Sequence, residues 1–156
     1  MKLDEIDHKI LETLQNDARL SNKELAASVG LAPSSCLERV RRLRNNGVLK
    51  GFHARVNPKN LNIGLEAMIS VQLQRHSRDM VESFHQHLMT LPEAMAIYHV
   101  AGTHDYLVHV AVRDSDHLRD LALDAFTTRE EVAHIQTALI FGTEQKPVLP
   151  NYLVPN

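Results

Sequence analysis

The sequence has little cysteine, glycine or proline and no long apolar run. Its single cysteine, Cys36, excludes an internal disulfide and cannot build a thiolate metal site alone. No apolar segment approaches the roughly 18 residues of a membrane helix, and Met1–Glu5 lacks the apolar stretch of a secretory signal. The 44% hydrophobic and 23% charged residues are typical of a globular chain. We therefore expect a folded cytoplasmic protein with no membrane partner.

Positive charge is concentrated in the first part of the chain. Residues 1–64 contain 11 Lys and Arg against 7 Asp and Glu, a net charge of +4, whereas residues 65–156 contain 6 against 12, a net charge of −6. A basic segment joined to an acidic one indicates that only the first faces a polyanion such as nucleic acid. The alternative at this point is a chance segregation of surface charge.

Three helices are predicted in the basic segment. Apolar residues recur at helical spacing between Leu3 and Asp17. Ser21 and Glu24 have the spacing of a capping box, which predicts a short second helix ending at Gly30. Pro33 suits the first turn of a third helix, which we expect to reach Asn45 or Asn46 before Gly47. A short extended stretch, 48–56, is expected after it.

After a linker at 59–64, extended and helical patterns alternate along the rest of the chain. Strands are expected at 67–73, 94–100, 106–112 and 135–141, and helices at 79–91 and 118–126. The order is βαββαβ, in which two helices pack on one face of an antiparallel sheet. The sequence thus predicts an α+β protein with a helix-turn-helix domain at 1–58, a linker at 59–64 and a ferredoxin-like domain at 65–156.

The third predicted helix has a basic, hydrogen-bonding surface. A helical wheel places Cys36, Leu37, Val40 and Leu43 on the core side. Arginine pairs well with guanine edges and phosphates, so the opposite side is suited to the major groove of double-stranded DNA. The alternative is a solvated charged face. The candidate DNA-binding residues are Asn22, Ser34, Ser35, Glu38, Arg39, Arg41 and Arg42.

The order of these motifs resembles the Lrp/AsnC family of leucine-responsive regulatory proteins. The segments concerned are Leu3–Leu11, Asn22–Ala26, Cys36–Leu43 and Gly47–Phe52, and Gly102–Tyr106 matches the family's Gly-x-x-Asp-Tyr turn. The resemblance covers nearly the whole chain. It implies a winged helix-turn-helix, a regulatory (RAM) domain that forms dimers and often octamers, and an amino-acid effector held between subunits near the Gly102 turn. Ala32, Arg44 and the segment 128–132 depart from the family pattern.

An effector site is expected at this turn. An amino acid needs an acceptor for its ammonium group and donors for its carboxylate. The candidate effector-binding residues are Gly102, Thr103, His104, Asp105 and Tyr106. The alternative is a hairpin turn that needs Gly102 for its backbone angles and Asp105 to bind the turn amides.

Eight of the ten histidines lie after Gly64. Their spacing does not favour a local metal site, because His85 and His87 point away from each other on a helix. We therefore expect no metal and no cofactor.

The resulting prediction is a cytoplasmic, sequence-specific transcription regulator, not an enzyme, whose assembly or DNA affinity responds to a small molecule. Two alternatives remain open. One is a tetrapyrrole enzyme, because siroheme decarboxylases resemble the same two-part fold. The other is a chromosome-architecture protein with little sequence preference, which the same arginines would support.

Overall fold

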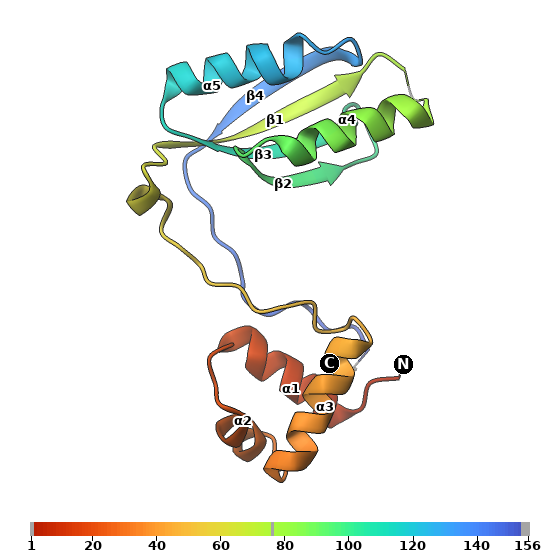
Figure 1. The fold of residues 1–156 in the computed structure, drawn as a ribbon, viewed down its shortest axis with the longest axis vertical. Helices are drawn as coiled ribbons and strands as arrows, with labels where there is room; N and C mark the ends of the chain where they lie inside the picture. The colour runs from red at the N-terminus through yellow and green to blue at the C-terminus, as the bar shows by residue number, and fades with distance from the viewer. Residues whose placement is uncertain (1, 76, 154–156) are drawn as a thin grey trace. The chain divides into compact units, whose positions relative to one another are not determined.

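The computed structural model describes residues 2–75 and 77–153. They divide into two compact units, one made of 2–55 with 144–153 and the other of 56–143 (Figure 1). The domain boundaries expected from the sequence, at 58 and 65, stay a prediction.

The first unit is built on three helices, α1 (Glu5–Asn16), α2 (Asn22–Ser28) and α3 (Pro33–Asn45). The Ser21–Glu24 capping box expected at the start of α2 is formed in both directions. Gly30, with φ of +71°, ends the turn after α2 in a conformation that L side chains rarely adopt. The core between the helices consists of Ile10, Leu14, Leu25, Ala26, Cys36 and Leu43.

Helix α3 differs from the helical wheel at Leu37. Cys36 and Leu43 are fully buried, but the Leu37 side chain was expected in the core and is 39% exposed. A wheel cannot distinguish the two edges of an apolar side, and α1 and α2 cover the edge that contains Cys36. The helix ends at Asn45 with Asn46 as its C-cap, and Gly47, whose φ is +70°, turns the chain away. The N–H groups of Val48 and Leu49 donate to the carbonyl of Leu43. Residues 48–57 form no strand with any described part of the chain.

The second unit follows the predicted βαββαβ order. After a 3₁₀ turn (Pro58–Leu61), its elements are β1 (Leu65–Leu73), α4 (Arg78–Thr90), β2 (Ala94–His99), β3 (Tyr106–Val112), α5 (Ser115–Leu121), a π-helical turn (Ala122–Thr127) and β4 (Val132–Ile140). All pairings are antiparallel, in the order β2-β3-β1-β4. Helices α4 and α5 lie on the same face of the sheet (Figure 1).

Strict alternation of side chains produces the core beneath these helices. Along β3, Tyr106, Val108, Val110 and Val112 are buried and the residues between them are half-buried. Phe84 of α4 is fully buried, with its ring centroid 5.4 Å from that of Tyr106 and 6.4 Å from that of Phe126. Edge-to-face contacts of this kind stabilise a core beyond the area that they bury.

Two elements of this unit begin three residues earlier than predicted. Helix α5 begins at Ser115 rather than 118, because the carboxylate of Asp114 accepts a hydrogen bond from the N–H of His117 and caps the helix. The first turn of this helix is polar, so the apolar pattern in the sequence begins only at Leu118. Strand β4 begins at Val132 rather than 135, since it pairs with Leu73 beyond a bulge in the β1–β4 pairing.

The tail after β4 lies with the first unit and contacts α1. The N–H of Leu149 donates to Oε1 of Gln15 at 2.9 Å, and the side chains of Asn151 and His8 lie 3.1 Å apart. Residues 144–153 therefore add a fourth segment to the helical unit.

Candidate nucleic-acid interface and effector region

The turn between α2 and α3 is held by a side chain that was predicted to bind DNA. One N–H of the Asn22 side chain donates to the carbonyl of Pro33 at 2.7 Å, so it joins the first turns of the two helices. The N-cap residue of α3, Ala32, provides no side-chain hydrogen bond. The Asn22 contact therefore positions the start of α3, and the rest of its amide remains for other partners.

The outward surface of α3 carries most of the predicted DNA-binding residues. Ser34, Ser35, Glu38 and Arg41 are exposed. Arg44, which was not in the predicted set, is exposed as well and follows Arg41 by three positions, so the two lie on the same face. Within the described part of the chain, neither arginine forms an ion pair. This surface can hydrogen-bond to bases and phosphates.

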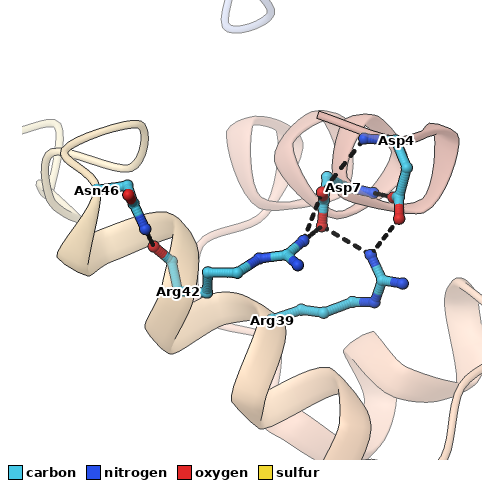
Figure 2. Close-up of polar contacts among 5 residues, drawn as sticks. All are labelled: Asp4, Asp7, Arg39, Arg42 and Asn46. Atoms are coloured by element: carbon cyan, nitrogen blue, oxygen red, sulfur yellow. Dashed lines mark hydrogen bonds and ion pairs between the residues drawn. The ribbon is translucent and has the colours of Figure 1, made fainter. Parts of the chain in front are cut away.

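Arg39 and Arg42 differ from Arg41, because their side chains run from α3 back to the start of α1 (Figure 2). Nη2 of Arg42 donates to both carboxylate oxygens of Asp7, at 2.9 and 2.7 Å. Nη1 of Arg39 donates to Asp7 at 2.9 Å and to Asp4 at 2.7 Å. The Arg42 side chain is 45% exposed, as its place opposite the core side of the helix predicts, but its ion pair with Asp7 was not expected. A helical wheel gives the direction of Cβ, whereas a long side chain can reach across to another helix.

The same contacts tie the cap of α1 to α3. Asp4 is the N-cap residue of α1 and accepts a hydrogen bond from the N–H of Asp7 at 2.8 Å. That bond and the Arg39 guanidinium lower the pKa of the Asp4 carboxyl below its usual value of 3.8. Hydrogen bonds from Ser21 likewise lower the pKa of Glu24 below 4.5. Both helix starts are therefore stabilised by carboxylates in their ionised form.

These pKa shifts predict the acid sensitivity of the helical unit. A carboxyl group whose pKa is lowered by folding stabilises the fold above its unfolded pKa, and that stabilisation is lost as the pH falls through the folded pKa. We expect the melting temperature measured by circular dichroism to fall below about pH 4, with a smaller fall in a variant carrying Asp4→Asn and Glu24→Gln. Glu12→Gln, at an exposed position on α1, is the control. Equal acid sensitivity of all three proteins would contradict the assignment.

The residues of the Gly102 turn differ in how far they are exposed. Gly102, with φ of +134°, and Thr103 are exposed, and His104 is half-buried. Asp105 is only 5% exposed, and its carboxylate accepts a hydrogen bond from the N–H of Leu73 at 2.7 Å. Direct effector contact by any of these residues stays a prediction.

Tyr106 also has contacts inside the fold. Its hydroxyl donates to the carbonyl of Val81 at 3.2 Å, and its ring stacks on that of His99 with centroids 4.8 Å apart. Burial raises the pKa of the Tyr106 hydroxyl, with a smaller contribution from Asp105. Asp105 and Tyr106 thus hold the turn in place, and the turn's accessible groups belong to 102–104.

A second turn, which was not among the predicted sites, reaches the same end of the sheet. The carbonyl of Glu131 accepts a hydrogen bond from the N–H of Gln74, next to the Leu73 N–H that Asp105 binds. An open pocket of about 560 Å³ lies between this turn and the start of α4. It is lined by Asp79, Met80, Ser83, Thr128, Arg129, Glu130 and Glu131.

Arg129, one of the residues that line this pocket, has an unsatisfied donor. Its Nη2 pairs with Glu131 at 2.6 Å, whereas its buried Nε has no hydrogen-bond partner among the described residues. The carboxylate of Glu131 also accepts from the Ser83 hydroxyl, and the hydrogen bonds it receives lower its pKa against the opposing effect of burial. The signal available in the sequence was the departure of 128–132 from the family pattern.

The histidines form separate contacts. His109 pairs with Glu66 at 2.8 Å, and His117 with Glu93 at 3.2 Å. Nε2 of His87 lies 2.7 Å from the carbonyl of Ala125 and, since a carbonyl only accepts, must donate there. Among residues 2–75 and 77–153, no group of three or more His, Cys, Asp or Glu could hold a metal ion. In the same residues, no helix is long and apolar enough to cross a membrane.

Comparisons with known proteins match both units. A model of a winged helix-turn-helix DNA-binding domain matches residues 3–50, and a model of the Lrp/AsnC ligand-binding domain matches residues 66–147. The chain is 45% identical over 139 residues to the transcriptional regulator AldR of Mycolicibacterium smegmatis, covering 89% of this chain and 81% of that protein. It is 41% identical over 119 residues to the leucine-responsive regulatory protein of Escherichia coli, covering 76% and 73%.

Solved structures agree with these matches. A transcriptional regulator from Neisseria meningitidis, crystallised as a complex with L-Met, superposes with a TM-score of 0.90 at 30% identity, covering 98% of this chain and all of that one. The predicted helix-turn-helix, the βαββαβ sheet domain and the resemblance are thereby confirmed. The chain belongs to the Lrp/AsnC family of DNA-binding transcription regulators.

Proposed function

We propose that this protein binds double-stranded DNA through the outward face of α3 and changes its assembly or DNA affinity when an amino acid binds its sheet domain. The observation that carries the proposal is the α3 surface, where Ser34, Ser35, Arg41 and Arg44 are exposed beyond a tight turn fixed by Asn22. Hydroxyl and guanidinium groups on such a helix suit base edges and phosphates in the major groove.

The effector is proposed to bind at the end of β1, where the turns 102–105 and 128–131 both attach. An amino acid carries a carboxylate and an ammonium group. The free Nε of Arg129 suits the carboxylate, and the acidic side chains beside it suit the ammonium group. The L-Met complex of the Neisseria relative makes L-methionine the first effector to test.

Self-association is part of the proposal. A homodimer would place two copies of α3 about one helical turn of DNA apart, roughly 34 Å, and a larger assembly would place further pairs on the same DNA. The proposed operator is correspondingly a palindrome or a series of such sites. Because the target is DNA, the cytoplasm is the proposed location. Since the named relatives are transcription regulators, we propose a regulatory and not an enzymatic role.

DNA binding is tested by fluorescence anisotropy over a salt series, with a duplex selected by the protein from a random pool and with an unselected duplex. Arg41→Ala and Arg44→Ala together should flatten the plot of log affinity against log salt by about 1.8 units per subunit, because each lost phosphate contact removes about 0.9 units. Arg119→Ala, at an exposed position on α5, should leave the slope unchanged. A slope unaffected by the double substitution would contradict the α3 assignment.

The effector is tested by repeating the titration with each amino acid, beginning with L-methionine. A coupling of 1–3 kcal/mol, typical of allosteric effectors, would change the DNA affinity about 5- to 150-fold. Absence of a shift with every amino acid, in affinity and in sedimentation, would contradict the effector proposal and leave the DNA-binding one intact. Equal affinity for selected and unselected DNA would favour a chromosome-architecture role.

A further inference from the structure

The carboxylate of Asp7 is the most completely enclosed charged side chain described in the helical unit. Asp7 is 0% exposed, although it lies in the first turn of α1. Its two oxygens accept hydrogen bonds from the guanidinium groups of Arg39 and Arg42 and, at 3.3 Å, from the N–H of Asp4. A buried carboxylate is tolerated only with partners of this kind.

This network changes what α3 presents to DNA. The charges of Asp4 and Asp7 balance those of Arg39 and Arg42, so the four side chains together are neutral (Figure 2). The side chains of Arg39 and Arg42 are 25% and 45% exposed, and carboxylates hold both guanidinium groups. Of the four arginines on α3, Arg41 and Arg44 therefore supply its uncompensated positive charge.

We propose that Asp7 is a positioning residue for DNA recognition, which fixes α3 against α1 and keeps Arg39 and Arg42 away from the phosphates. This inference rests on the proposed DNA binding by α3. Contacts to phosphate strengthen binding to every sequence alike, whereas contacts to base edges discriminate. Keeping two guanidinium groups away from the backbone lowers the affinity for random DNA and so raises the ratio of specific to non-specific affinity.

The test is an Asp7→Asn variant of the full chain, titrated with the selected and the unselected duplex over a salt series. The amide is close in size to the carboxylate but uncharged, so the Arg42 guanidinium loses its ion pair and can reach a phosphate, whereas Arg39 keeps its ion pair with Asp4. We expect the salt dependence to steepen by about 0.9 units per subunit, the value for one added phosphate contact. Affinity for the unselected duplex should rise and the specificity ratio should fall. A purely structural role would lower the melting temperature without steepening the salt dependence.

A matched pair of variants keeps the test decisive if Asp7→Asn does not fold. Arg42→Gln removes a guanidinium that pairs with Asp7, and Arg41→Gln removes one that does not. We expect the salt slope to be unchanged by Arg42→Gln and to flatten by about 0.9 units per subunit in Arg41→Gln.

Two results would overturn the inference alone, namely an unsteepened slope in folded Asp7→Asn or an equal flattening by Arg42→Gln and Arg41→Gln. Absence of salt-dependent binding by the unsubstituted protein would instead overturn the proposed function, and the inference with it.

Discussion

Phe84→Ala is expected to destabilise the sheet unit by about 4 kcal/mol, the range for removing a fully buried aromatic ring from a core. The Phe84 ring lies between α4 and β3, in contact with Tyr106 and Phe126. It is 0% exposed, and backbone hydrogen bonds hold the surrounding sheet, so the cavity cannot close by a small shift. The lost contacts and the cavity both lower the free energy of unfolding.

Urea denaturation followed by circular dichroism measures this effect. Met89→Ala is the control, because Met89 lies on the same helix with 64% of its surface exposed and should change the free energy of unfolding by less than about 0.5 kcal/mol. In a second measurement, amide hydrogen exchange should show faster exchange in β1 and β3 of Phe84→Ala. If Phe84→Ala lost no more stability than Met89→Ala, the packing of Phe84 between α4 and the sheet would be contradicted.

Patterns local in sequence were enough to predict the fold. The capping box at Ser21, the turn at Gly30 and the alternation along 106–112 are each encoded by residues within a few positions of one another. The structure has them at the expected places. Strand β3 has the predicted bounds because its four buried residues alternate without interruption.

The differences come from contacts between residues far apart in the chain. Asp7 and Arg42 are 35 positions apart, and no periodicity within α3 indicates that its arginines reach α1. The same limit explains Leu37, since only the placement of α1 and α2 determines which edge of α3 is covered. Arg44 was left out of the predicted DNA-binding set, yet it is exposed on the same face as Arg41.

At the candidate effector site, too, the role of each polar group depends on contacts with distant residues. The motif 102–106 indicated a polar turn, but the sequence could not distinguish groups that face a ligand from groups that hold the turn. The structure places the Asp105 carboxylate on the end of β1, where its hydrogen bond closes the pairing of β1 with β3. The adjacent turn at 128–131 lies at the same end of β1 because β4, which follows it, pairs with β1 up to Leu73. This pairing is not visible in the sequence.

Asp105→Ala is therefore expected to destabilise the sheet unit by about 2–3 kcal/mol, because it leaves the buried N–H of Leu73 without its acceptor. Thr103→Ala, at an exposed position in the same turn, is the matched control and should leave the free energy of unfolding unchanged. Urea denaturation of both variants measures the difference.

Asp105→Asn separates the two roles of this residue, since its amide oxygen can still accept from Leu73. If Asp105 acts through the fold, Asp105→Asn should retain most of the stability and the response of DNA binding to the effector. A stable Asp105→Asn protein that has lost this response would instead make Asp105 a direct effector contact.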